Sequence, residues 1–451
     1  MSENQNGDNR VRVKDTKTVR ALQGIVIVLA FFAILLGIVV AGGFLSRVIN
    51  GTTEQMELSI TKPTIFTTVF EPSPTPTPTP TPFVLNEKLP STPEHDQMLE
   101  EYFGPLPEVD KVVPLKHKEV KGIYTNAALN LEANFELAEH SEINAFVIDL
   151  KESYGVLFDS KNELANDIGY VYPQYDLKEV VEQCHEHDIY VIGRIVCFKD
   201  VSLATKYPDR AICDSAGNPL AFYNEGSEIF ANPYDTRNWD YLIDLAQEAL
   251  DMGVDEIQFD YIRFPTGGST TGAEPYFGVE GEVPSKSDAI NRFLLTARRR
   301  IQDPTGIPVS ADIFGIAVSS SLDGEILGQD WSMLGFTSVD SLCPMIYPSH
   351  YAKGTMMNGH IHEYPDKDPY QVMFDALYIG GKYHNAEDYC VVRPYCQAFT
   401  ASYLGEGNYM SYDYNAINDQ IRAIEDAGLN EFILWNVLGE YPDGSYGGND
   451  G

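Results

Sequence analysis

From residue 119 onward, short apolar runs alternate with segments in which apolar positions recur every three or four residues. The runs favour buried strands, and the helical spacing favours amphipathic helices. Over 176–187, for example, Leu177, Val180, Val181 and Cys184 share one face of a helix. We therefore expect strands over 121–127, 145–151, 190–198, 255–263, 308–314, 341–347, 390–398 and 431–437, and helices over 131–140, 176–187, 238–252, 286–302, 325–336, 370–380 and 414–427.

This alternation of strands and helices predicts an α/β fold, a (β/α)8 TIM barrel, with a doubly wound open sheet as the alternative. No G-x-G-x-x-G or G-x-x-x-x-G-K-[ST] motif follows any expected strand, so the nucleotide-binding signature of the open sheet is missing. Only residues 438–451 follow the last strand, and this Gly-rich stretch is too short for an eighth helix. We expect segment 83–118 to cover that gap.

The most apolar stretch of the chain lies near its beginning. An uncharged run from about Gly24 to Leu45 exceeds the roughly 20 residues that a helix needs to span a bilayer. Basic residues precede it, which places the N-terminus in the cytoplasm. We predict a cytoplasmic tail over 1–20 and a transmembrane anchor over 21–48. A signal peptide cleaved near Val39-Val40-Ala41-Gly42 is the alternative.

Residues 49–110 are expected to form a Thr/Pro-rich stalk and linker. Within it, residues 71–82 begin Glu-Pro-Ser-Pro and continue as Thr-Pro repeats. Such a segment is extended and cannot build a core. The domain over 111–451 would then stand outside the cell, on a single-pass anchor in the cell membrane.

The composition of the chain argues against nucleic acid and metal ions as binding partners. The formal net charge is −35, from 31 basic and 66 acidic residues, so the chain lacks the basic surface that nucleic acid requires. Six cysteines are scattered without a CxxC pair, and most are expected to be buried free thiols. Histidine, aspartate and glutamate show no metal-ligand spacing, and no G-x-S-x-G elbow is present. We expect neither a metal nor another cofactor.

Nearly every expected strand ends in a polar, ionisable or aromatic side chain. In a barrel alternate residues point inward, and the carboxyl ends of the strands carry the chemistry. This set offers hydroxyl partners, aromatic faces and two carboxylates, which suits a sugar. The candidates, in strand order, are Asp149 and Lys151 on one face of the second strand, Arg194 on the third, Asp260 with Tyr261 and Arg263 on the fourth, Asp312 on the fifth, Tyr347 on the sixth, Arg393 and Gln397 on the seventh, and Trp435 and Asn436 on the eighth.

Asp260 and Asp312 come from neighbouring strands and are the candidate catalytic pair. Cleaving an acetal requires a proton on the leaving oxygen and negative charge near the oxocarbenium-like centre. Arg194 or Arg263 beside Asp260 would keep that carboxylate ionised and leave Asp312 as the better acid. Structural roles stay open as alternatives: ion pairs for Asp260 and for Asp149 with Lys151, backbone capping for Asp312, and core packing for Tyr347 and Trp435.

Several strand segments resemble a bacterial family of putative glycoside hydrolase barrels, long described only as a domain of unknown function. The similar stretches lie on five strands and extend over about residues 119–440. They are Gly122-Ile123-Tyr124, Phe146-Val147-Ile148-Asp149-Leu150-Lys151, Phe259-Asp260-Tyr261-Ile262-Arg263-Phe264-Pro265, Ser310-Ala311-Asp312-Ile313-Phe314-Gly315 and Pro344-Met345-Ile346-Tyr347-Pro348-Ser349-His350-Tyr351.

That family is distantly similar to the alpha-amylase superfamily, and the resemblance implies that Asp260 is the strand-four nucleophile. The strand-five acid of that superfamily is usually glutamate, whereas this sequence has Asp312. Met345-Ile346-Tyr347 and Trp435 also look like the sugar-binding positions of chitinases. The chitinase strand-four glutamate is absent here, since the strand ends Asp260-Tyr261.

These observations predict a membrane-anchored extracellular glycoside hydrolase that acts on a cell-wall or surface polysaccharide. One alternative is a catalytically inactive barrel that binds surface glycan. A chitinase-like glycosidase, and then a polysaccharide deacetylase or lyase, rank behind it.

Overall fold

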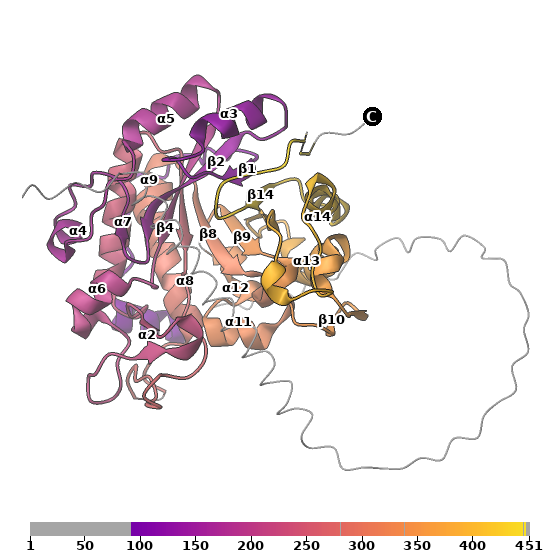
Figure 1. Ribbon diagram of the computed structural model, residues 1–451. Coiled ribbons are helices and arrows are strands. Elements are labelled where there is room, and N and C mark those ends of the chain that lie inside the picture. Colours follow the sequence, from indigo (N-terminus) through magenta and orange to yellow (C-terminus); the bar gives the residue numbers. More distant parts are fainter. Residues whose placement is uncertain (1–91, 280, 338, 445, 448–451) are drawn as a thin grey trace, which may run out of the picture.

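The computed structural model describes residues 92–447, apart from 280, 338 and 445, and shows a closed parallel barrel (Figure 1). The terminal strand β1 pairs with both β2 and β14, which closes the sheet and excludes the doubly wound alternative. The barrel prediction is thus confirmed. Its strands are β1 (Lys121–Tyr124), β2 (Ala145–Glu152), β4 (Tyr190–Val196), β7 (Glu256–Asp260), β8 (Val309–Phe314), β9 (Ser341–Met345), β12 (Val391–Val392) with β13 (Tyr395–Gln397), and β14 (Phe432–Trp435).

The predicted tail, anchor and Pro/Thr-rich stretch lie outside the described residues as far as residue 91. Within 92–447, no described helix combines the length and the hydropathy that crossing a bilayer requires.

Helices follow the strands and surround the barrel, as Figure 1 shows. Every expected helix is present, but 325–336 is two helices, because Gly328 ends the first of them in a left-handed conformation. The helices are α2 (Pro93–Phe103), α3 (Leu131–Glu139), α4 (Glu163–Ile168), α5 (Leu177–Glu186), α6 (Val201–Lys206), α7 (Thr236–Asp251), α8 (Lys286–Ala297), α9 (Asp303–Thr305), α10 (Gly315–Ser319), α11 (Ser321–Leu327), α12 (Trp331–Thr337), α13 (Pro369–His384) and α14 (Tyr414–Asp426).

Two barrel strands differ from their expected extent. The seventh is split into β12 and β13 at Pro394, which has no N–H to give to the ladder. The fourth, β7, ends at Asp260 rather than 263, because Tyr261 has a left-handed backbone with φ of 51°. Arg263 therefore lies beyond the strand, in the loop that follows it.

The barrel interior is polar along β7, whose alternate side chains point inward as expected. At the lower level Glu256 accepts hydrogen bonds from Arg393, at 2.7 Å, and from the Ser310 hydroxyl. One layer higher, Gln258 accepts a 2.6 Å hydrogen bond from the Tyr395 hydroxyl. Asp260 forms the uppermost level. Paired polar groups thus fill a barrel core that is otherwise apolar.

The cysteines are distributed as predicted, without a disulfide among the described residues. Cys184, Cys197, Cys343 and Cys396 are buried free thiols, whereas Cys213 and Cys390 are partly exposed.

We expected segment 83–118 to cover the gap after β14. The described part of this segment lies elsewhere. Helix α2 packs against α8, where Arg292 donates to the Gly104 carbonyl at 2.7 Å. The chain then crosses the amino-terminal ends of the strands, where His117 contacts both Asp340 and Glu431 at 2.9 Å. The gap is covered by the C-terminal segment instead. There, the Tyr441 hydroxyl donates to backbone carbonyls of both β1 and β14.

Long connections at the carboxyl ends of the strands build one rim of the site. The connection from β4 to α7 includes a small hairpin, β5 (Ala221–Phe222) with β6 (Glu228–Ile229). Backbone hydrogen bonds join it to the loop after β7, through Tyr223 with Gly268 and Thr270 with Ala221. Another hairpin, β10 (Thr355–Met357) with β11 (His360–His362), follows β9.

Candidate active site

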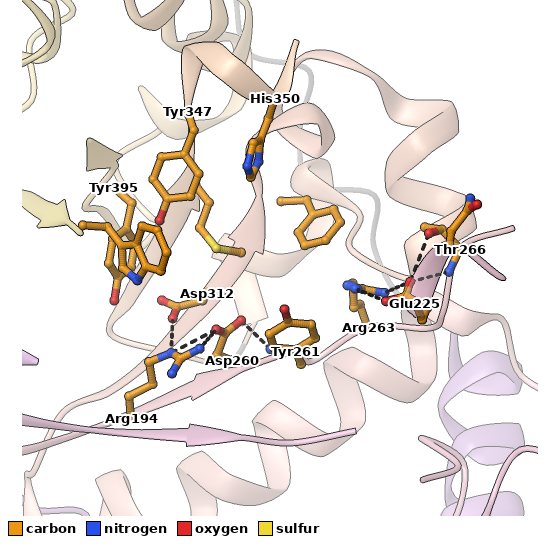
Figure 2. Close-up of a pocket in the computed structure, with 14 residues that line it drawn as sticks. Arg194, Glu225, Asp260, Tyr261, Arg263, Thr266, Asp312, Tyr347, His350 and Tyr395 are labelled. Carbon is orange, nitrogen blue, oxygen red and sulfur yellow. Dashed lines mark hydrogen bonds and ion pairs between the residues drawn. The ribbon is translucent and has the colours of Figure 1, made fainter. Parts of the chain in front are cut away.

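Arg194, at the carboxyl end of β4, is the centre of a cluster of four acidic side chains (Figure 2). Its guanidinium donates to Asp260 Oδ2 from Nε at 3.0 Å and from Nη2 at 2.6 Å. Nη1 donates to Asp149 and, at 3.3 Å, to Glu152. Its Nε also lies 3.9 Å from Asp312 Oδ2. One cation therefore holds carboxyl groups from β2, β7 and β8 in a single cluster.

The predicted pair, Asp260 and Asp312, lies on the same side of the barrel wall. Arg194 Nε lies 3.0 Å from Asp260 Oδ2 and 3.9 Å from Asp312 Oδ2. The distance between the two Oδ2 atoms therefore cannot exceed the sum of these two distances. Glycoside hydrolases hold their two carboxyl groups about 5–5.5 Å apart for retention and about 6.5–9.5 Å apart for inversion. The two contacts place both carboxyl groups within reach of one ligand, and Arg194 is one of the two arginines expected beside Asp260.

Asp312 lies in an environment that favours its protonated form. Its side chain is 2% exposed and its Oδ1 atom has no hydrogen-bond partner among the described residues. Burial, followed by the charge of Asp260, raises the pKa of Asp312 well above its usual range. Asp260, in contrast, accepts two hydrogen bonds from Arg194 and one from the Tyr261 backbone N–H. The two carboxyl groups are therefore chemically distinct, as an acid and a charged partner must be.

The backbone of Tyr261 explains part of this arrangement. A positive φ is rare for a bulky residue and is maintained only where the surrounding structure enforces it. At this residue the backbone N–H donates to Asp260 Oδ1. The side chain of Tyr261 lines the pocket, with the Arg263 guanidinium 5.1 Å from its ring centre.

The carboxyl pair lines a pocket whose walls are mostly aromatic and charged side chains. Aromatic side chains gather at one end, above Asp312 in Figure 2. Tyr347 and Trp435 have ring centres 5.8 Å apart, and His350 packs edge-on against Tyr347 at 5.0 Å. Burial lowers the pKa of His350 to about 4, so its ring is neutral at physiological pH.

Arg263 lies at the other end of the pocket and does not contact Asp260 (Figure 2). It forms a bidentate ion pair with Glu225, at 2.8 and 2.9 Å, and both side chains are 2% exposed. Thr266 donates to the same carboxylate from its backbone N–H and its hydroxyl. Of the two arginines expected beside Asp260, only Arg194 is its partner.

Five of the candidate substrate-binding residues lie outside the pocket lining. A β-bulge between Asp149 and Lys151 separates the two residues that were expected to share a face. Lys151 is buried and donates to the Val196 carbonyl at 2.7 Å. It also forms an ion pair with Asp200 at 2.8 Å. The remaining three are held by the body of the domain: Arg393 pairs with Glu256 and Glu431, Gln397 donates to Asp366, and Asn436 donates to the Ala398 carbonyl.

Asp149 also lies outside the lining but contacts it through Arg194, and it accepts a 2.7 Å hydrogen bond from the Tyr124 hydroxyl. The candidates that do line the pocket are Arg194, Asp260, Tyr261, Arg263, Asp312, Tyr347 and Trp435.

The sequence reasoning missed part of the lining: Asn224, Glu225, Thr266, Phe314 and Tyr395. Asn224 and Glu225 belong to the hairpin connection, which has no strand pattern that would have placed them near β7. Tyr395 could have been found, because it lies two residues before Gln397 on the same inward-facing strand. No group of three or more His, Cys, Asp or Glu side chains in the described chain is arranged to hold a metal ion.

Comparisons with known proteins bear on the fold and the family of this chain. A comparison with curated proteins found no match. A hypothetical protein from Ruminiclostridium thermocellum ATCC 27405 is 35% identical, over 42% of this chain and 96% of its own, with a TM-score of 0.38. The glycoside hydrolase domain of PgaB (BpsB) from Bordetella bronchiseptica has a TM-score of 0.51 at 12% identity, over 72% of this chain and 95% of its own, so it shares the fold.

A noncanonic maltogenic alpha-amylase, AmyB from Thermotoga neapolitana, is also similar, at 12% identity and a TM-score of 0.39, over 72% of this chain and 69% of its own. The model of the family described as "Putative glycosyl hydrolase domain" matches residues 120–441, which is the whole barrel. The resemblance seen in the strand motifs is confirmed: this chain belongs to the putative glycosyl hydrolase domain family.

Proposed function

We propose that this protein is a glycoside hydrolase that cleaves O-glycosidic bonds of a polysaccharide through Asp260 and Asp312. The observation that carries the proposal is the sharing of Arg194 by two carboxyl groups with different environments. Asp260 is held by the guanidinium as a hydrogen-bond acceptor. Asp312 is buried, with one oxygen unpartnered within the described chain.

In the proposed reaction, protonated Asp312 gives its proton to the glycosidic oxygen as the C–O bond breaks, and the electron pair of that bond leaves with the departing sugar. Asp260 places negative charge beside the resulting oxocarbenium-like centre. Water supplies the hydroxyl group of the product, and its second proton restores Asp312. Tyr347 and Trp435 provide an aromatic surface for a sugar ring at the adjoining end of the pocket.

A panel of 4-nitrophenyl glycosides and of cell-wall polysaccharides tests this proposal. We expect wild-type hydrolysis of at least one panel member and a loss of about 10³-fold or more in kcat/KM for Asp260→Asn, because electrostatic stabilisation of the transition state is lost. Asp188→Asn is the matched control, since Asp188 is exposed and its φ of 58° is one that asparagine tolerates. Equal rates for wild type and Asp260→Asn would remove Asp260 from the chemistry.

The second candidate function is glycan binding without turnover. It is favoured by Asp312, whose side chain is shorter than the glutamate usual at this position in the alpha-amylase superfamily and is only 2% exposed. Binding of a polysaccharide by the wild-type chain, with no hydrolysis and no loss of affinity in Asp260→Asn, would support that function instead.

We also propose that the domain is held outside the cell by a membrane anchor over 21–48, and that its substrate is a cell-wall or surface polysaccharide. The uncharged apolar run and the Thr-Pro repeats support this arrangement. The full chain should remain with membranes after carbonate extraction, and protease added to intact cells should degrade the barrel domain. A chain released by carbonate, or protected from protease until the cells are broken, would contradict the anchor or its orientation.

A further inference from the structure

The pocket extends from the Arg194 cluster to Arg263, and its lining includes polar atoms without partners among the described residues. Three buried atoms of its lining have no hydrogen-bond partner among the described residues: Asp312 Oδ1, His350 Nε2 and Arg263 Nε. A buried donor or acceptor without a partner is energetically costly, so a bound ligand that satisfies these atoms would be favoured. In Figure 2, His350 lies above the carboxyl pair and Arg263 lies to one side of it, beyond Tyr261.

At the Arg263 end of the pocket, packing and an ion pair hold the side chain of Arg263 in place. The guanidinium lies 4.4 Å from the Phe314 ring centre and 5.1 Å from that of Tyr261, and Glu225 occupies its two terminal nitrogens. Its Nε is thus the donor that remains, while packing and the ion pair fix its position. Rigid donors of this kind suit a ligand hydroxyl, because little conformational entropy is lost on binding.

Asn224 lies next to this group on the hairpin connection. Its side chain is partly exposed and lines the pocket, and its amide makes no hydrogen bond with the described chain. It packs against Gly267, where a Cβ atom would approach the amide nitrogen to 2.6 Å. Gly267 also has a φ of +75°, so glycine is required there both for the turn and for the position of Asn224.

We propose that the surface formed by Asn224, Arg263 and Thr266 binds a second sugar unit, next to the unit held over Asp260 and Asp312. The site would then recognise at least a disaccharide, rather than a single sugar with any leaving group. This inference rests on the proposed glycoside hydrolase function. The chemistry fits a neutral sugar ring, since an amide, a hydroxyl and a guanidinium N–H offer both donors and acceptors.

The test compares matched mono- and diglycosides. The probes are the 4-nitrophenyl glycosides of glucose and maltose, of galactose and galactobiose, and of N-acetylglucosamine and chitobiose. Asn224→Ala is the main variant, because the side chain is partly exposed and makes no hydrogen bond that folding would need. Asn218→Ala is the matched control, since Asn218 is exposed on the same connection and does not line the pocket.

For the sugar that is hydrolysed, we expect a higher kcat/KM for the diglycoside than for the monoglycoside. Asn224→Ala should lower the diglycoside value by about 2- to 10-fold, the effect of one neutral hydrogen bond, and leave the monoglycoside value unchanged. Asn218→Ala should change neither. Equal losses for both substrates, or no preference for the diglycoside, would overturn the second sugar position without affecting the hydrolase proposal.

Binding separates the two proposals if no glycoside is hydrolysed. Isothermal titration of the full chain with maltose, galactobiose and chitobiose, and with the corresponding monosaccharides, then measures the second position directly. Tighter binding of a disaccharide that is weakened only in Asn224→Ala would support it, even though hydrolysis fails. Binding of the mono- and disaccharide with equal affinity, or no binding of either, would overturn it.

Discussion

The surroundings of Asp312 favour the protonated form of its carboxyl group. Burial and the nearby charge of Asp260 both act against its ionisation. Its carboxyl group can therefore carry a proton at a pH where an exposed aspartate has lost it. Because the pKa is raised, the acid is fully available below its ordinary range, and the proton is lost as pH rises through the raised value.

We predict that kcat/KM of the wild type falls on the alkaline side as Asp312 loses its proton. Asp312→Asn should remove this alkaline limb and lower kcat/KM by about 10²- to 10⁴-fold for an alkyl glycoside, the usual contribution of a general acid. A dinitrophenyl glycoside should lose much less, because its leaving group needs no proton. Equal losses on both substrates would show that Asp312 is not the acid.

Arg194 sets the positions of the acidic groups, and two substitutions separate its charge from its shape. Arg194→Met should lower the free energy of unfolding by about 3–5 kcal/mol, since it leaves buried carboxylates without their cation. Arg194→Lys keeps the charge but cannot give the same fork of donors, so we expect a smaller stability loss together with a clear loss of kcat/KM. Urea unfolding and steady-state kinetics measure the two effects. Equal stability losses would contradict this assignment.

Asp260, Asp312 and Arg194 could be proposed as site residues from the sequence because a charged residue inside an apolar strand is easily recognised. Lys151 met the same criterion, yet a one-residue bulge in β2 turns it away from Arg194 and towards Asp200. Alternation along a strand does not reveal such a bulge. Glu225 could not have been paired with Arg263 either, because the two are brought together by loop structure rather than by strand register.

At the scale of elements, the site depends on three neighbouring strands. β4, β7 and β8 are joined by parallel ladders, so the backbone hydrogen bonds fix the relative positions of Arg194, Asp260 and Asp312. The packing of β4 is tight beside Arg194. A Cβ atom on Gly193 would lie 2.5 Å from Leu150 Cδ1 and 3.0 Å from Val254 Cγ1.

We predict that Gly193→Ala lowers the free energy of unfolding by about 1–3 kcal/mol, the usual cost of overpacking a core. Displacement of β4 should also lower kcat/KM, because Arg194 follows directly. Gly268→Ala is the control, since a Cβ atom there meets nothing within 4 Å and the glycine has no left-handed φ. Thermal unfolding measures both variants. Equal stability of Gly193→Ala and Gly268→Ala would refute the prediction.

The elements were largely predictable, since eight buried strands and the helices between them carry clear periodicities. The errors have local causes. The 255–263 strand was overextended because nothing in the residue types reveals that Tyr261 is left-handed. The short hairpins β5–β6 and β10–β11 were missed because two- or three-residue strands have no measurable period.

At the scale of the whole molecule, the chain ahead of the barrel is fastened to the amino-terminal ends of the strands. His117 lies between Asp340 and Glu431, and Glu431 also accepts a hydrogen bond from Arg393. Hydrogen bonds to the two carboxylates raise the pKa of His117 to about 10. The histidine is therefore a cation in the folded protein at neutral pH.

This contact predicts a pH-dependent stability. The raised pKa means that His117 contributes fully below about pH 6.5, its ordinary pKa, and that the contribution is lost as pH approaches about 10. Urea unfolding should therefore show a larger decline in stability from pH 7 to pH 10 for wild type than for His117→Gln. Parallel declines in the two proteins would show that His117 does not titrate in this range.

The sequence assigned segment 83–118 to the wrong place for a related reason. A chain without periodic apolar positions gives no indication of the surface that it contacts, so His117 could not be linked to Asp340 and Glu431 in advance. The C-terminal tyrosines that close the gap after β14 were likewise hidden in a Gly-rich segment.

The carboxyl groups around Arg194 also have a consequence for the charge of a ligand in the pocket. Four acidic side chains meet this single guanidinium, so acidic groups outnumber it even when Asp312 carries a proton. Arg263, the other arginine of the lining, is already neutralised by Glu225. A uronic acid or a phosphate-bearing repeat unit would bring a like charge into a water-poor space, where repulsion is poorly screened. If the pocket binds glycans as proposed, we therefore expect it to bind anionic glycans less well than neutral ones.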